Sequence, residues 1–101
     1  MRILVTDGHP DAGSFCDALA RAYIDGAMAQ HEVRVLRLRE LDFDPILHGG
    51  FTAPTPFEPA LVEAREAIRW CQHWVLVTPN WWASVPALLK GFIDRVFQHA
   101  A

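Results

Sequence analysis

The 101-residue sequence lacks several features that would assign it to a special class of protein. Its two cysteines, Cys16 and Cys71, stand far apart, with no CxxC pair and no His at ligand spacing. Neither a disulfide framework nor a metal site is therefore predicted. No apolar run approaches the length needed to span a membrane. The start of the chain has no signal-peptide pattern, so a reducing cytoplasm is the expected location.

Positive charge is scarce as well. Nine Lys and Arg residues stand against twelve Asp and Glu residues, and the formal net charge is -3, so no nucleic-acid partner is predicted. The close group Arg34, Arg37 and Arg39 alternates along a predicted strand, and we interpret it as a solvent-exposed strand face. Asp94 and Arg95 are likewise expected on a solvated helix face. The histidines other than His9 share no spacing that indicates a metal or catalytic site: His31, His48, His73 and His99.

Three short runs of apolar and β-branched residues predict strands. Residues 3–6 and 74–78 do not alternate, which is typical of strands buried on both faces of a parallel sheet. Residues 33–39 alternate in part with arginine, as in a half-exposed edge strand. A helical period follows each run, so the order is βαβαβα. This order predicts an α/β fold with a parallel sheet, right-handed crossovers and helices on its faces.

The helices have recognisable first residues. Ser14 is the expected N-cap of the first helix, Pro59 opens the second, and the third begins near Ser84 and Pro86. Residues 41–58 hold three prolines and two glycines and predict one long loop. The predicted inward faces are Phe15, Ala18, Leu19 and Ala22 in the first helix, Ala60, Ala64, Ala67, Ile68 and Cys71 in the second, and Leu89, Phe92, Ile93, Val96 and Phe97 in the third.

Two loops form the predicted ligand site. In an open parallel α/β sheet, ligands bind beyond the carboxyl ends of the strands, where the strand order reverses. With the strand order 2-1-3, that point lies between the loop from Gly8 to Ser14 and the loop from Pro79 to Ser84. A chain of this size is expected to form one domain, residues 1–101.

The first loop, GHPDAGSF, contains no GxGxxG pattern, and the chain contains no Walker A sequence. It does offer backbone N–H groups that lead into a helix N-terminus, with the Ser14 hydroxyl and the His9 imidazole nearby. Such a loop is a suitable nest for a phosphate. The alternative interpretation is that Ser14 only caps its helix and residues 8–10 only turn the chain. Taken alone, the loop leaves both interpretations open.

The second loop places two adjacent tryptophans, Trp81 and Trp82, at the mouth of the predicted crevice. Indole rings provide flat apolar walls that match a planar aromatic ligand. The N–H groups of Trp82 and Ala83 are then available to the polar edge of such a ligand. The alternative is that one of the tryptophans anchors a core or a subunit interface.

Three segments of the chain resemble a known family. Residues 79–97, PNWWASVPALLKGFIDRVF, resemble the P-x-x-W-x-x-x-P-A-x-L-K-G-x-x-D-R-V-F signature of NAD(P)H dehydrogenase (quinone) proteins. Residues 8–15 are similar to the family's G-H-P-x-x-x-S-F phosphate loop, and Phe43-Asp44-Pro45 matches its F-D-P element. The three matches occur in the family's order and together cover the whole chain. The resemblance implies a flavodoxin-like three-layer sandwich with a parallel sheet.

This resemblance implies an enzyme, a flavin-dependent oxidoreductase. Hydride passes from NAD(P)H to bound FMN or FAD and then to a quinone or similar acceptor, and no catalytic side chain is expected because the chemistry belongs to the flavin. By the same resemblance, His9, Ser14 and Phe15 hold the flavin phosphates, and Trp82 also walls the substrate pocket. The residues implied to contact the flavin ring are Pro79, Asn80, Trp81, Trp82 and Ala83.

The sequence departs from this family in two ways. Cys16 stands where many members have Asn, so no polar phosphate contact is assigned there. Members normally continue with two more strands and a glycine-rich loop. We therefore expect a fold that is incomplete at its C-terminus, without strands four and five. The outer edge of the third strand is then unpaired or covered by another chain.

Members of the family are commonly homodimers, and a homodimer is expected here. A competing interpretation is a non-catalytic regulatory or interaction subunit, because some relatives attach to potassium-efflux transporters. The sequence leaves open the identity of the acceptor, the choice between NADH and NADPH, and the choice between FMN and FAD.

Overall fold

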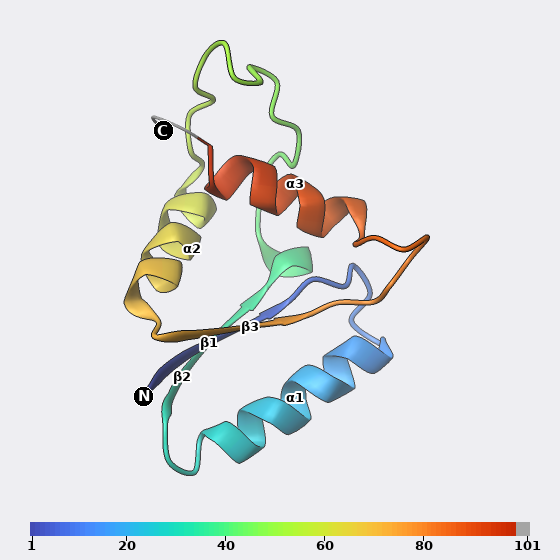
Figure 1. Cartoon of the computed structure of the whole chain (residues 1–101), viewed down its shortest axis with the longest axis vertical. Coiled ribbons are helices and arrows are strands. Elements are labelled where there is room, and N and C mark those ends of the chain that lie inside the picture. The colour runs from blue at the N-terminus through green and yellow to red at the C-terminus, as the bar shows by residue number, and fades with distance from the viewer. Residues whose placement is uncertain (99–101) are drawn as a thin grey trace.

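The sheet has three parallel strands in the order β2-β1-β3 (Figure 1). The structure, a computed structural model, describes residues 1–98, so His99 lies outside the described residues. The strands are β1 (Arg2–Asp7), β2 (Glu32–Arg37) and β3 (His73–Val77). β1 pairs with both neighbours, with Val5 opposite Val35 on one side and Val75 on the other. The predicted α/β fold, parallel sheet and strand order are confirmed.

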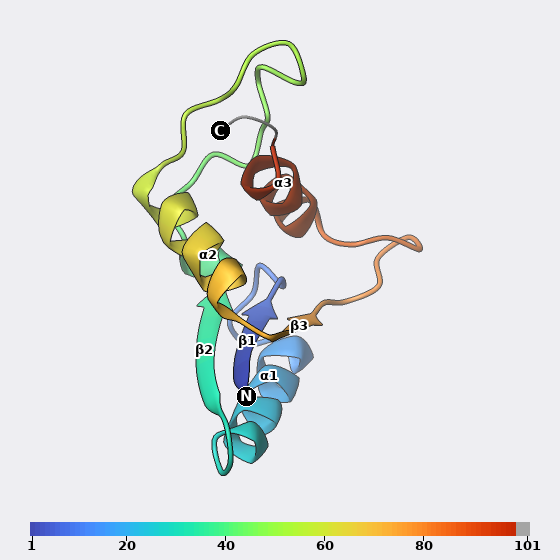
Figure 2. The same cartoon turned by 60° about the vertical axis from the view of Figure 1, so that its left-hand side comes forward.

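Helices cover both faces of the sheet and make three layers. Helix α1 (Phe15–Ala27) lies on one face, and helices α2 (Pro59–Trp70) and α3 (Ala87–Val96) lie on the other (Figure 2). A short 3-10 helix, η1 (Leu38–Glu40), follows β2 and was not among the predicted elements. No helix in the part of the chain that the structure describes is long and apolar enough to cross a membrane.

The central and edge strands differ in burial. β1 is buried from Ile3 onward, as predicted, because it is paired on both sides and covered on both faces. β2 is partly exposed, as expected of an edge strand. The prediction that β3 is fully buried is wrong, since Leu76 is 41% exposed. Among residues 1–98 no strand pairs with the outer edge of β3, so its side chains remain partly in contact with solvent.

The first helix is rotated relative to the predicted orientation. Ser14 caps it as predicted, with its Oγ accepting a hydrogen bond from Asp17 N at 3.2 Å. The residues that face the sheet are Cys16, Asp17, Ala20 and Ile24. The predicted inward residues are exposed instead: Phe15, Ala18, Leu19 and Ala22. Ion pairs between Asp17 and arginines at the end of β2 and in η1 favour this rotation, since they hold Asp17 against the sheet.

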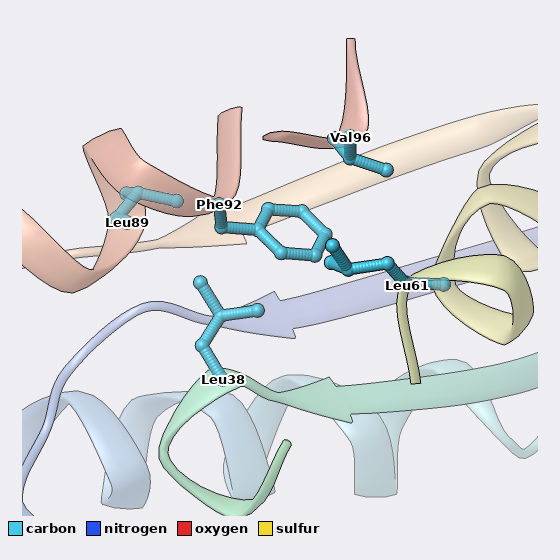
Figure 3. Close-up of a cluster of buried hydrophobic side chains, with 6 residues drawn as sticks. Leu38, Leu61, Leu89, Phe92 and Val96 are labelled. Atoms are coloured by element: carbon cyan, nitrogen blue, oxygen red, sulfur yellow. The ribbon is translucent and has the colours of Figure 1, made fainter. Parts of the chain in front are cut away.

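A compact cluster of apolar side chains fills the space beneath α2 and α3 (Figure 3). Its members come from η1, α2 and α3, and full burial of one such side chain contributes about 1.5–3 kcal/mol. Leu61, which the predicted stripe of α2 omits, is fully buried, whereas Phe97 of the predicted α3 stripe is half exposed. The buried cluster consists of Leu38, Leu61, Ala64, Leu89, Phe92 and Val96.

Residues 41–58 form the predicted long loop, which extends away from the sheet and is anchored to α3 (Figure 1). The expected solvated position of Arg95 is wrong, because its side chain is 1% exposed. Its Nη2 donates to Glu58 Oε1 at 2.6 Å and to the carbonyl of Pro56 at 2.8 Å. Arg95 Nη1 donates to the carbonyl of Asp44. This one guanidinium therefore attaches both ends of the loop to α3.

Candidate functional site

The two predicted loops meet at the carboxyl ends of β1 and β3. The backbone N–H of Gly8 donates to the carbonyl of Val77 at 2.9 Å. The rings of His9 and Trp81 pack edge to face, with centroids 5.1 Å apart and planes at 79°. A Cβ at Gly8 would lie 3.0 Å from Leu89 Cδ2, so the first loop packs closely on α3. The predicted juxtaposition of the loops is confirmed.

The ring of His9 is fixed by its own loop. Its Nδ1 lies 2.9 Å from the backbone nitrogen of Asp11. Because a backbone N–H can only donate, Nδ1 must accept, and in the neutral ring the proton is on Nε2. The backbone N–H of His9 donates to Asp7 Oδ1 at 3.0 Å. The loop therefore holds His9 with a donor, Nε2–H, left for a ligand.

Some of the backbone N–H groups of the first loop donate hydrogen bonds within the loop itself. Asp11 Oδ1 accepts from Gly13 N at 3.0 Å, and the Asp11 carbonyl accepts from Ser14 N at 3.3 Å. Among residues 1–98, the N–H groups of Phe15 and Cys16 donate to no acceptor. The N–H groups in the first turn of α1 are thus available to the predicted nest. Ser14 caps the helix, and its hydroxyl proton is still available to a ligand.

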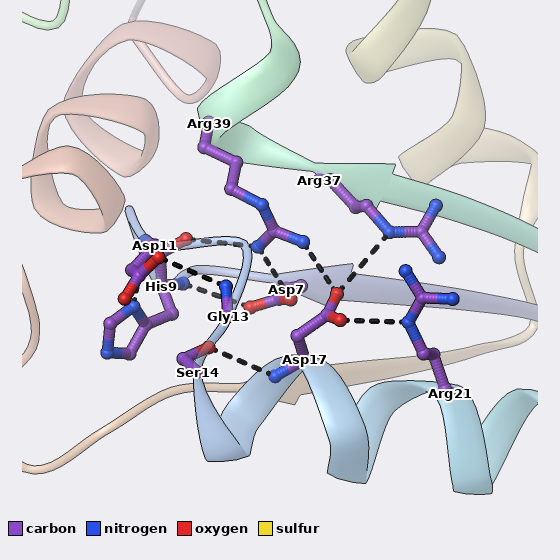
Figure 4. Close-up of polar contacts among 9 residues, drawn as sticks. All are labelled: Asp7, His9, Asp11, Gly13, Ser14, Asp17, Arg21, Arg37 and Arg39. Atoms are coloured by element: carbon purple, nitrogen blue, oxygen red, sulfur yellow. Dashed lines mark hydrogen bonds and ion pairs between the residues drawn. The ribbon is translucent and has the colours of Figure 1, made fainter.

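A network of charged side chains supports this loop from behind (Figure 4). Asp7 is fully buried at the end of β1, and Arg39 of η1 donates to its Oδ2 at 2.8 Å. Arg39 also donates to Asp17 Oδ1 at 2.6 Å. Hydrogen bonds from Arg21 and then from Arg39 lower the pKa of the Asp17 carboxyl below its ordinary value. The Asp17 carboxyl is therefore held ionised, and both carboxyl groups behind the loop are paired with Arg39.

This network corrects the expectation of a solvated arginine face. Arg34 is exposed and lies over the Trp70 ring, 4.2 Å from its centroid. Arg37, at the end of β2, contacts the carboxylate of Asp17, and Arg39, in η1, contacts those of Asp7 and Asp17. The sequence interpretation missed their role. The sequence did contain a signal for it, since arginines stand at the end of one predicted strand and aspartates follow another.

The second loop contains a strained turn. Trp81 and Ser84 exchange two backbone hydrogen bonds of 3.0 Å, which closes a four-residue turn. The two central residues, Trp82 and Ala83, have φ of 55° and 58°. The left-handed conformation costs a residue other than glycine about 1–2 kcal/mol. Such outliers cluster at functional sites, which supports a ligand-binding role for this turn.

Trp82 at the tip of this turn is 100% exposed. Within the described part of the chain, the N–H groups of Trp82 and Ala83 donate to no acceptor. Pro79 is half buried and Asn80 is exposed, so both border the turn without filling the core. An exposed indole beside two free N–H groups can contact a flat ring that has polar atoms at its edge.

The residues at the two loops fit a ligand with a phosphate at one end and a flat ring at the other. The free N–H groups of Phe15 and Cys16 and the Nε2–H of His9 suit the phosphate end. The turn that carries Trp82 suits the ring end. Among residues 1–98, no group of three His, Cys, Asp or Glu side chains is arranged to hold a metal ion.

The fold and the position of these loops define an open, doubly wound α/β protein with its candidate ligand site at the switch point of the sheet. Comparison with known proteins then assigns the family. The sequence profile of the family described as "Flavodoxin-like fold" matches residues 1–101, and the chain belongs to this family.

Individual relatives agree with this assignment. An uncharacterized NAD(P)H oxidoreductase of Haemophilus influenzae is 33% identical over 98% of this chain and 52% of its own length. The solved structure of NAD(P)H:quinone oxidoreductase from Methanothermobacter marburgensis gives a TM-score of 0.81 at 26% identity, covering 97% of this chain and 54% of that one. An apo NADH:FMN oxidoreductase, EMOB, gives 0.75 at 26% identity, covering 94% and 49%. The chain spans about half the length of the curated relatives it matches.

Proposed function

We propose that this chain supplies phosphate and ring contacts to a flavin-dependent NAD(P)H oxidoreductase that binds FMN or FAD. The observation that carries the proposal is the pair of adjoining loops, each with free backbone N–H groups and an aromatic side chain. The names of similar proteins, which include NAD(P)H oxidoreductases and an NADH:FMN oxidoreductase, support it. Because those relatives are about twice as long, the activity of the whole protein is part of the proposal.

The first loop is assigned to the phosphate. The N–H groups of Phe15 and Cys16 point from the first turn of α1, where the helix dipole favours an anion. His9 adds Nε2–H, and its orientation is already fixed by the Asp11 N–H. The Ser14 hydroxyl caps the helix through its oxygen and can still donate its proton. The assignment therefore retains His9, Ser14 and Phe15 and adds the Cys16 backbone.

The second loop is assigned to the ring. A bound flavin would accept a hydride from NAD(P)H and pass it on to the acceptor. The turn offers the Trp82 indole as an apolar wall. The N–H groups of Trp82 and Ala83, which have no acceptor among the described residues, are available as donors. Pro79, Asn80 and Trp81 border the same edge. Trp82 is the proposed wall of the substrate pocket as well.

The further parts of the proposal concern the acceptor, the assembly and the location. A quinone acceptor is supported by the name of the Methanothermobacter marburgensis structure and by the apolar Trp82 wall. A homodimer would cover apolar groups that this chain leaves exposed, such as Phe15 and Leu19. A cytoplasmic location agrees with the two free cysteines, Cys16 and Cys71.

A flavin titration of the purified chain tests the proposal. We expect saturable binding of FMN or FAD, followed through the visible absorbance, and bleaching of that absorbance when NADH or NADPH is added. Trp82→Ala should weaken binding by about tenfold, because it removes the ring contact. Phe51→Ala is the matched control, since Phe51 is 98% exposed on the long loop and is not assigned to the site.

Two results would contradict the proposal. A folded chain that binds neither flavin would show that these residues do not form a flavin site. A Trp82→Ala variant with unchanged flavin affinity but an altered oligomeric state would favour the competing role as an interaction subunit. Sedimentation velocity on the same samples distinguishes these cases.

A further inference from the structure

Two buried carboxylates lie directly behind the loop that the proposed function assigns to a phosphate. Asp7 is fully buried at the end of β1, and Asp17 is nearly buried in the first turn of α1. Like charges repel more strongly where solvent is excluded. The loop can therefore accept an anion only if these carboxylates are neutralised within the fold.

Arg39 is placed to neutralise both. Its Nη1 donates to Asp7 Oδ2 at 2.8 Å and to the carbonyl of His9 at 3.2 Å, and its Nη2 donates to Asp17 Oδ1 at 2.6 Å (Figure 4). The Arg39 side chain is only 10% exposed. One guanidinium from η1 thus joins the end of β1, the first loop and the first turn of α1.

Two other arginines contact Asp17 and share its neutralisation with Arg39. Arg21 Nε donates to Asp17 Oδ2 at 2.8 Å, but the Arg21 side chain is 66% exposed, so solvent and salt screen this pair. Arg37 Nε lies 3.8 Å from Asp17 Oδ1 and has no hydrogen-bond partner among the described residues. Within residues 1–98, the cation paired with Asp7 is Arg39.

We propose that Arg39 is a positioning residue that makes the first loop able to bind a flavin phosphate, by neutralising Asp7 and Asp17 and by holding the His9 carbonyl. The inference rests on the proposed function and assigns a role to a residue outside both loops. It follows that Arg39 influences the phosphate end of the ligand and leaves the ring end unaffected.

FMN and riboflavin carry the same ring and differ in the phosphate, so the ratio of their dissociation constants isolates the phosphate contribution. The wild-type chain should prefer FMN. In Arg39→Met this preference should fall about tenfold or more, while riboflavin affinity stays within about twofold. Arg69→Met is the matched control, because Arg69 is exposed on α2 on the opposite face of the sheet. It should leave the preference unchanged.

Asp17→Asn should change the preference for FMN in the opposite direction. It removes a carboxylate and keeps Arg39, so the preference for FMN should rise. In the double variant Arg39→Met with Asp17→Asn, the preference should return toward that of the wild type. If both single variants instead weaken FMN and riboflavin equally, Arg39 has only a structural role and the inference is overturned. Circular dichroism and thermal unfolding verify that each variant is folded. If Arg39→Met is not folded, Asp17→Asn decides the test, and an unchanged or lower preference for FMN in that variant overturns the inference.

Failure of the proposed function gives a different pattern. If the wild-type chain binds neither flavin, the amide NMR signals of residues 9–16 are followed during titration with inorganic phosphate. Shifts that occur in the wild type and disappear in Arg39→Met support the inference, and an absence of shifts in the wild type overturns it. If the wild type binds FMN and riboflavin equally, the flavin site stands and the role of Arg39 is overturned.

Discussion

Arg39 and Arg95 are both almost buried, and each donates hydrogen bonds to a carboxylate from another segment of the chain. Arg39 joins β1, the first loop and α1, whereas Arg95 of α3 joins the two ends of the long loop. A guanidinium suits this task because its planar group of donors reaches several acceptors at fixed angles. Irregular backbone next to the sheet is therefore held by single charged side chains.

The Arg95–Glu58 pair should make stability depend on pH. The hydrogen bond from Arg95 is the main reason that the pKa of Glu58 falls from 4.5 to about 2. Because the folded pKa lies below the unfolded one, the pair stabilises the fold fully above pH 4.5, and this contribution is lost as pH falls toward 2. We expect Glu58→Gln to lower the free energy of unfolding by about 3 kcal/mol at pH 7.

Urea unfolding at several pH values measures this effect. The difference between the wild type and Glu58→Gln should shrink between pH 4.5 and pH 2. Glu63→Gln, at an exposed position in α2, the helix that begins one residue after Glu58, is the control and should differ little from the wild type at any pH. A difference that stays constant across this range would show that Glu58 does not act through its charge.

At the scale of elements, the long loop and α3 fit together closely. Pro45 packs on Gly91, where a Cβ would lie 2.4 Å from Pro45 Cβ and 2.6 Å from the Pro45 carbonyl oxygen. Phe43 packs edge to face on Phe92, with centroids 6.0 Å apart. The F-D-P element and the K-G-x-x-D-R segment are thus two halves of one structural contact. Their joint presence in the sequence is explained by packing.

Gly91→Ala should displace the loop from α3. The added methyl group meets backbone atoms of Pro45, which cannot move aside like a side chain, so we expect a loss of about 1–3 kcal/mol in the free energy of unfolding. Cleavage of residues 46–56 by a protease should become faster. The measurements are urea unfolding and limited proteolysis of the folded chain.

Gly26→Ala is the matched control for this prediction. Gly26 lies in α1, with open space where its Cβ would be. Alanine favours a helix over glycine by about 1 kcal/mol, so this variant should be more stable than the wild type. Equal effects of the two substitutions would mean that the loop does not pack on Gly91 in solution.

At the scale of the whole molecule, the outer side of α1 and the outer edge of β3 have no partner in the described chain. Phe15 and Leu19 form an exposed stripe on α1, and the outer edge of β3 is unpaired in residues 1–98. The relatives are about twice as long as this chain. The stripe and the edge are therefore the places where contact with further polypeptide would change stability most.

Two substitutions on α1 show which stripe is buried in solution. If the chain is a monomer, Leu19→Ser should change the free energy of unfolding by less than about 0.5 kcal/mol, since Leu19 is exposed. Ile24→Ala should cost about 2–4 kcal/mol, because Ile24 is buried against the sheet. A large loss for Leu19→Ser that depends on protein concentration would show that a second chain covers the stripe. Thermal unfolding at two concentrations measures both.

The architecture was predictable because local patterns report it. The apolar run of β1, the Ser14 cap and Pro59 at the start of α2 each reflect short-range preferences of the chain. The position of the candidate site was predictable as well, since the strand order places the ends of β1 and β3 together. The left-handed conformation of Trp82 was not, because nothing in its side chain favours it.

What the sequence by itself determined was therefore the order of elements, the parallel sheet and the two loops at its carboxyl edge. The tertiary structure decided which face of α1 is buried and where Arg39 and Arg95 go. Both outcomes depend on ion pairs between residues that are distant in sequence. The pair of Asp17 with Arg39 fixes the buried face of α1, and the pair of Glu58 with Arg95 holds the Arg95 side chain in the interior. Periodicity gives the apolar stripe of a helix, but a buried ion pair can outweigh it, because leaving either charge unpaired inside the fold costs more than exposing a few apolar side chains.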